Sequence, residues 1–179
     1  MLTLLLASPL AVAATWTLPD LLHAVARNQH HAVRFVQTTH LSSLTHPLQT
    51  SGLLSYRKPD TMVMKQMHPT RATYRVVDGR LYVHDAQGRH SVSISHVPQV
   101  MAIVSSFEGL LSGNQALLLH DYTARLSGSV HAWRLLLVPR LRSLAQVVRT
   151  IEVRGHGGQL SEVKTMTPKG DFSVMRLSP

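Results

Sequence analysis

The sequence predicts a mainly β domain in which a strongly curved antiparallel sheet or barrel is covered on one side by helices. Three observations predict this fold class. Runs of strand-forming residues recur at spacings of about 8–12 residues with turn residues between them. Several runs are joined by tight turns, of which Asp78-Gly79 is the clearest. Two apolar segments of helical periodicity must bury a face, and one side of the sheet is available for them.

The first helix is predicted over residues 17–31, TLPDLLHAVARNQHH. Thr17 and Asp20 have the spacing of a capping box, and Pro19 falls in the first turn, where proline is tolerated. Residues 33–95 then predict an antiparallel meander, because strand-forming runs flank Asp78-Gly79 and a second turn follows at Gln87-Gly88.

The second helix is predicted from Pro98 to Gly113-Asn114. Its apolar positions recur at helical spacing: Val100, Val104, Phe107 and Leu111. Strands are predicted again at 117–126, 131–139, 147–155, 159–166 and 171–177, with a short helical turn at 140–146. In total the sequence predicts roughly ten strands and two substantial helices.

Composition and the N-terminal segment limit the class of protein. The chain has 179 residues, enough for one domain, and no cysteine, which excludes disulfides, thiol catalysis and cysteine-ligated zinc. Residues 1–13 form an apolar run that ends in Ala11-Val12-Ala13, which predicts a signal peptide cleaved before Ala14. The alternative is a buried N-terminal helix. We therefore expect an exported protein with a single domain at residues 14–179.

The sequence contains no pattern of a known catalytic or metal site. Its 12 histidines do not have metal-ligand spacing, and GxSxG, P-loop and dinucleotide motifs are absent. The net charge is +9, but the cations are spread singly along alternating strands, unlike a nucleic-acid footprint. We expect no enzyme, no cofactor, no metal and no nucleic-acid partner. The charge suits anionic lipid head groups or an acidic partner protein.

Apolar side chains remain as the candidate functional groups. Met62 and Met64 fall on one face of a predicted strand, and Leu54 and Tyr56 fall on one face of its neighbour. Methionine adapts to irregular apolar ligands, so these residues either line a lipid cavity or form ordinary core. Burying acyl methylene groups contributes about 0.8 kcal/mol each, so even a modest cavity binds a lipid chain firmly.

Three segments together resemble the outer-membrane lipoprotein carrier (LolA-like) family: FVQT at 35–38, PLQTSGLLSYRKPD at 47–60 and VVDGRLYVHD at 76–85. The order of elements agrees over about residues 20–178, and the motifs are specific from 33 to 95. The resemblance implies an incomplete, strongly curved antiparallel half-barrel covered by helices. It also implies that lipid-modified chains bind in the apolar interior under a helical lid.

The resemblance assigns candidate site residues. For the lipid cavity these are Phe35, Leu54, Tyr56, Met62, Met64 and Tyr82. For the lid and its latch they are Arg57, Lys58, Val100, Val104, Phe107 and Leu111. Lysine at position 58 stands where the family usually has arginine, and it cannot reproduce the planar guanidinium fork. This departure and the high positive charge suggest a divergent paralogue.

The function implied is that of a periplasmic carrier in a Gram-negative bacterium. It would take a lipid or acylated protein from an inner-membrane donor and deliver it to an outer-membrane acceptor, acting as a monomer. An acylated lipid, a polyene lipid and a glycolipid remain alternative cargoes. The alternative function is a periplasmic lipid-sensing or protein-interaction module of the same fold, in which the positively charged surface is the working part.

Overall fold

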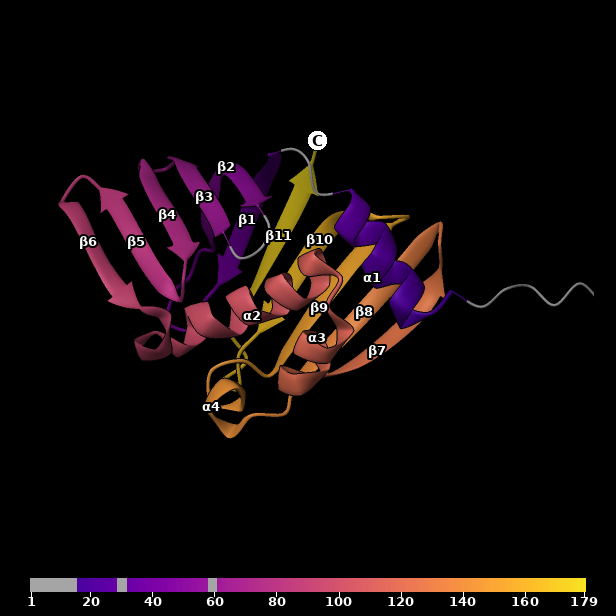
Figure 1. The fold of residues 1–179 in the computed structure, drawn as a ribbon. Helices are drawn as coiled ribbons and strands as arrows, with labels where there is room; N and C mark the ends of the chain where they lie inside the picture. Colours follow the sequence, from indigo (N-terminus) through magenta and orange to yellow (C-terminus); the bar gives the residue numbers. More distant parts are fainter. Residues whose placement is uncertain (1–15, 29–31, 58–60) are drawn as a thin grey trace, which may run out of the picture.

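The computed structural model describes residues 16–28, 32–57 and 61–179. Within these ranges eleven antiparallel strands form one sheet, in the order β6-β5-β4-β3-β2-β1-β11-β10-β9-β8-β7 (Figure 1). The sheet is not closed into a barrel, because β6 and β7 are its two edges. The prediction of an incomplete antiparallel barrel covered by helices is confirmed.

The strands are β1 (Val33–His40), β2 (Leu48–Arg57), β3 (Thr61–His68), β4 (Ala72–Val77), β5 (Arg80–Asp85), β6 (Gly88–Ser93), β7 (Tyr122–Ser129), β8 (Ala132–Pro139), β9 (Thr150–His156), β10 (Gln159–Met166) and β11 (Phe172–Ser178). The helices are α1 (Leu18–Arg27), α2 (Pro98–Ser112), α3 (Gln115–Asp121) and α4 (Arg142–Ala145), with a 3₁₀ turn η1 (Ile94–His96). No helix in the described ranges is long and apolar enough to cross a membrane.

Helix α1 begins with the predicted capping box. The backbone N–H of Thr17 donates to the Asp20 carboxylate at 3.0 Å, and the Asp20 N–H donates to the Thr17 hydroxyl at 3.4 Å. The helix ends at Arg27, so it is shorter than the predicted segment, whose residues 29–31 lie outside the described ranges. Its buried face packs toward the sheet and consists of Leu21, Leu22 and Val25.

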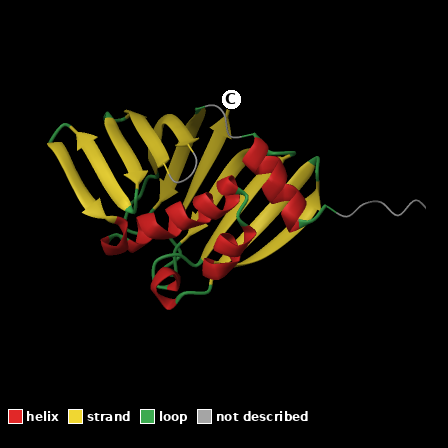
Figure 2. Cartoon of the chain, viewed as in Figure 1, coloured by secondary structure: helices red, strands yellow, loops and turns green. Residues whose placement is uncertain are grey.

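The segment that contains η1, α2 and α3 crosses the sheet from one edge to the other. Strand β6 ends at one edge and β7 begins at the opposite edge, so the chain between them must traverse a face of the sheet. Helices α2 and α3 do this in succession, and they lie with α1 on the same side of the sheet (Figures 1 and 2). Helix α2 ends, as predicted, where Gly113 adopts the left-handed conformation with φ 76°.

The prediction of a strand over 117–126 is wrong in its first half, because residues 117–121 belong to α3. The Asn114 side chain caps this helix by accepting from the Leu117 N–H at 3.0 Å. Leu118 is fully buried against α2, and a Cβ at Gly109 would lie 2.9 Å from the Leu118 Cα. The close packing of α3 on α2 and the Asn114 cap therefore make residues 117–121 helical, although their apolar run suggested a strand.

Two apolar clusters fill the space between helices and sheet. The larger joins all the helices to the central and C-terminal strands, and its fully buried sheet residues include Leu135, Leu137 and Ile151. The smaller lies beneath the N-terminal half of α2, where Val104 packs with Val76, Leu81 and Val83 of β4 and β5. The helices therefore bury one face of the sheet over nearly its whole width.

The opposite face of the sheet, turned away from the helices, is basic. Strand alternation places one lysine or arginine on this outer face from each described strand: Arg34, Arg57, Lys65, Arg75, Arg80, Arg89, Arg125, Arg134, Arg154, Lys164 and Arg176. The carboxylates at outward positions of these strands are Glu152 and Glu162. The single scattered cations of the sequence thus share one surface.

Candidate functional site: an apolar cavity between the two halves of the sheet

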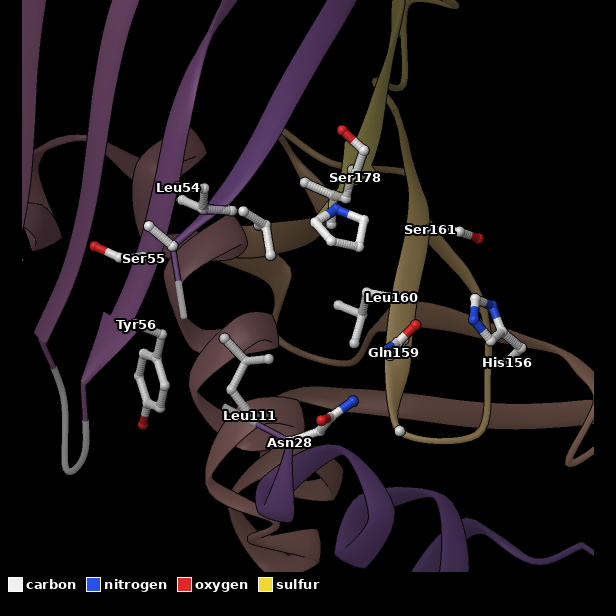
Figure 3. A pocket seen from close by; sticks show the side chains of 15 residues that line it. Asn28, Leu54, Ser55, Tyr56, Leu111, His156, Gln159, Leu160, Ser161 and Ser178 are labelled. Carbon is white, nitrogen blue, oxygen red and sulfur yellow. The ribbon is translucent and has the colours of Figure 1, made fainter. Parts of the chain in front are cut away.

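A cavity of about 400 Å³ opens where β1 and β2 meet the ends of α1 and α2 and the start of β10 (Figure 3). Its apolar wall consists of Val33, Leu54, Tyr56, Leu111, Leu160 and Leu177. Ala32, Gly158 and Pro179 also line it, and its polar side chains are Asn28, Ser55, His156, Gln159, Ser161 and Ser178. The cavity therefore has an apolar wall with hydrogen-bonding groups beside it.

Strands β2 and β10 supply opposite walls of the cavity. In β2, alternation directs Leu54 and Tyr56 inward, and both are almost fully buried. In β10, the pairing with β9 is irregular between Leu160 and Glu162, and such a bulge re-aims the neighbouring side chains. Figure 3 shows Leu160 directed into the space that faces Leu54.

The turn between β9 and β10 is held in place from two sides. A Cβ at Gly158 would lie 2.2 Å from the Ala24 carbonyl oxygen, so the turn packs directly on the α1 backbone. On the other side the Trp133 indole N–H donates to the Gly157 carbonyl at 2.9 Å. These contacts fix the position of Leu160 at the cavity wall, because it follows the turn immediately.

Helix α2 is tied to the edge strand β7 by a buried tyrosine. The Tyr122 hydroxyl donates to the Ala102 carbonyl of α2 and lies 3.4 Å from the Ser105 hydroxyl. Burial raises the pKa of Tyr122 to about 12, an effect that the nearby Asp121 carboxylate reinforces. From Ala102 the helix runs about 14 Å along its axis to Leu111, which it presents to the cavity.

The arrangement suits binding of an apolar chain rather than bond-making chemistry. Its groups are aliphatic side chains, hydroxyls and amides, together with His156 at the polar side. In the part of the chain that the structure describes, no three histidine, aspartate or glutamate side chains are placed to hold a metal ion. The double ion pair of Glu152 with Arg134 and Arg154 lies on the outer face, away from this cavity.

Comparison with known proteins identifies the family of this fold. The sequence matches the model for the family described as "Outer membrane lipoprotein carrier protein LolA-like" over residues 6–178. The chain belongs to this LolA-like family. A search of curated proteins gave no match.

Solved structures resemble this LolA-like chain at low sequence identity. They include a LolA superfamily protein from Nitrosomonas europaea, with 11% identity, 92% of this chain and 93% of that chain covered, and a TM-score of 0.46. The complex of MucA and MucB from Pseudomonas aeruginosa matches with 16% identity over 89% of this chain, with a TM-score of 0.49. That match covers 55% of the other chain, so this chain spans about half of its length.

The cavity of the LolA-like chain contains some of the predicted residues. Leu54 and Tyr56, predicted for the lipid cavity, line it, and so does Leu111, predicted for the lid. Phe35 faces the same side of the sheet but is buried in the core. The remaining predicted residues of that side pack against one of the two clusters without lining the cavity: Met62, Met64, Val100, Val104 and Phe107.

Tyr82 was predicted on the wrong face. Its neighbours Leu81 and Val83 are the buried residues of β5, so alternation places Tyr82 on the outer face, where it is 43% exposed. Tyr82 was chosen because it is aromatic, but its aliphatic neighbours Leu81 and Val83 make the core contacts. A slip of one residue in a strand is enough to exchange the two faces.

The predicted latch is not supported at Arg57. Tyr56 points inward, so Arg57 lies on the exposed outer side at the end of β2. Within the described part of the chain, no hydrogen bond or ion pair joins its side chain to α2. Lys58, the other predicted latch residue, lies outside the described residues.

Sequence reasoning missed the cavity residues from the C-terminal strands, notably Leu160 and Leu177. They reach the site because β11 pairs with β1, far away in the sequence. The alternating pattern of residues 171–177 predicted a strand but carried no signal for its partner.

Proposed function

We propose that this LolA-like protein is a carrier that binds the acyl chain of a lipid or of a lipid-modified protein. The observation that carries the proposal is the apolar cavity between β2, β10 and the end of α2, in a member of a family described by outer membrane lipoprotein carriage. Its volume of about 400 Å³ falls within the usual range of small-molecule sites.

The lining suits both parts of a lipid. Each acyl methylene that contacts Leu54, Leu111 or Leu160 contributes about 0.8 kcal/mol when it leaves water. Asn28 and Gln159 can hydrogen-bond an ester or head group at the polar side. Leu111 lies at the end of α2, so a small displacement of this helix end widens the cavity without unfolding the sheet.

The cellular setting belongs to the same proposal. The apolar run at residues 1–13 and the family together favour export to the periplasm, with residues 14–179 as a single monomeric carrier domain. An inner-membrane donor would load the cargo and an outer-membrane acceptor would receive it. The protein acts in this scheme by binding and release rather than by catalysis.

A pair of matched leucine substitutions tests the cavity. Leu160 is half-buried and lines the cavity, and Leu136 is half-buried on the outer face of β8. Replacing Leu160 with Asn removes apolar contact with two or three methylenes, which should weaken binding of a fluorescent fatty acid by about 2 kcal/mol, or roughly thirtyfold. Leu136→Asn should leave the affinity within twofold of the parent.

Equal affinities for the parent and Leu160→Asn would refute the cavity as the binding site. Mass spectrometry of the native protein supplies a second readout, because a carrier should retain co-purifying lipid. The sensing alternative predicts a stable complex with a protein partner that survives lipid release. A carrier predicts instead that labelled lipid moves from the protein to acceptor vesicles.

A further inference from the structure

The outer face of β3 to β6 concentrates positive charge that no carboxylate neutralises. Lys65, Arg75, Arg80 and Arg89 come from four adjacent strands and are exposed at outward positions. None of them forms an ion pair within the described ranges. We refer to these side chains, together with Tyr82, as the basic face.

The other half of the outer face is different, because its cations are partly paired. Glu152 bonds Arg134 at 2.5 Å and Arg154 at 2.8 Å, and Glu162 lies 3.6 Å from Arg176. The basic face has no such carboxylate at an outward position of its strands. Arg125 and Lys164 of this half form no ion pair within the described ranges either, but on β3 to β6 every outward cation is unpaired.

Tyr82 lies in the middle of these cations. It stands opposite Arg75 in the β4–β5 pairing, and Arg80 precedes it by two residues on the same face of β5. The tyrosine is 43% exposed, so it places an amphipathic ring among these cations. Tyrosine is enriched at membrane–water interfaces because its ring is apolar and its hydroxyl is polar.

We propose that the basic face is a docking surface for an anionic phospholipid bilayer. The four cations lie on strands about 4.8 Å apart, so they span roughly 14 Å. Lipid head groups can move laterally to meet cations arranged in this open way. A stable protein partner would need a packed, largely apolar interface core. The large apolar side chains exposed on β3 to β6 are Met67 and Tyr82, which are too few to provide one.

Docking through this face goes beyond cargo binding, because it uses the side of the sheet opposite the helices. A bilayer bound there leaves α2 and its end at Leu111 on the other side of the sheet (Figure 1). The protein can then stay at a membrane surface without its helical side being covered by that membrane. This inference does not depend on which lipid, if any, occupies the cavity.

Vesicle flotation with the full chain tests the proposal. We compare phosphatidylcholine vesicles with vesicles containing phosphatidylcholine and phosphatidylglycerol at a ratio of about 7:3, at low salt. Each cation contributes about fivefold to binding of an anionic surface. The double variant Arg75→Gln/Arg89→Gln should therefore bind the anionic vesicles roughly thirtyfold more weakly, and Tyr82→Ser several-fold more weakly.

The matched control is Arg149→Gln/Lys169→Gln, which removes the same charge from exposed positions outside the basic face. It should weaken binding less than threefold. An equal loss of affinity for anionic vesicles in both double variants would show that binding depends on net charge alone, and would overturn the proposal of a docking face. A parent protein that shows no preference for anionic vesicles would overturn it as well. Binding of poly-L-glutamate without binding of vesicles would also overturn it, in favour of an acidic protein partner.

Discussion

Replacing Tyr122 with Phe should destabilise the protein at neutral pH but not at pH 11. The substitution removes the hydroxyl that joins β7 to the Ala102 carbonyl of α2 while it keeps the buried ring. A hydrogen bond of this kind contributes about 1 kcal/mol net to folding. We therefore expect the variant to unfold about 1 kcal/mol more easily at pH 8.

The pH dependence follows from the raised pKa of Tyr122. The folded protein holds this group at a pKa of about 12, against an ordinary value of 10.0, because burial disfavours the phenolate. Its contribution to stability is fully present below pH 10 and is lost as the pH rises through 12. At pH 11 the loss is about 1.4 kcal/mol, as large as the gain from the hydrogen bond.

Urea unfolding of the parent and of Tyr122→Phe at both pH values checks this expectation. The difference between their free energies of unfolding should be about 1 kcal/mol at pH 8 and should vanish or slightly reverse at pH 11. Groups common to both proteins cancel in this comparison. The exposed Tyr82→Phe serves as a control and should change stability by under about 0.5 kcal/mol. A difference for Tyr122→Phe that stays constant between the two pH values would refute the assignment of the pH dependence to this hydroxyl.

Two further substitutions probe the cavity wall and the outer face. Gly158→Ala places a Cβ 2.2 Å from the α1 backbone, so it should lower the free energy of unfolding by at least about 2 kcal/mol and weaken fatty-acid binding by moving α1. Its control is Gly157→Ala, whose Cβ meets no atom within 4 Å. This variant should lose only about 1–2 kcal/mol, from the strain of its φ of 50°, and fatty-acid binding should be unchanged. Glu152→Gln breaks two partly exposed ion pairs and should cost under about 1 kcal/mol at pH 7 in thermal unfolding. Hydrogen bonds from Arg134, and to a smaller extent from Arg154, lower the pKa of Glu152 below its ordinary value of 4.5. The ion pairs therefore stabilise the protein above pH 4.5, and this stabilisation is lost as the pH falls through the pKa of the folded state. A difference in stability between the parent and Glu152→Gln that persists at about pH 2 would contradict this.

Elements defined by local interactions could be read from the sequence. The Thr17/Asp20 capping box forms as predicted, and Asp78-Gly79 makes the hairpin turn with φ of 49° and 67°. Helix α2 begins and ends where proline and glycine indicated. Each of these features depends on residues within a few positions of one another, so the physical cause is contained in a short window of sequence.

Features that need contacts between distant segments could not be read in this way. Leu117 to Asp121 became helical because Gly109 admits Leu118 against α2, and the cavity formed because β11 pairs with β1. In β5 successive side chains point to opposite faces of the sheet, and the packing of the helices on one face buries Leu81 and leaves Tyr82 exposed. Such outcomes depend on which face of each element is buried against which partner, and local patterns do not specify the partner.

By itself, the sequence determined that the chain is an antiparallel β protein with apolar helices, a high positive charge and the motifs of the LolA-like family. The tertiary structure decided where these properties lie. The path of α2 across one face buries the aliphatic side chains and leaves a cavity at Leu160. Strand alternation sends the cations to the other face, because a charged side chain cannot leave water without a partner, whereas an aliphatic one gains by doing so.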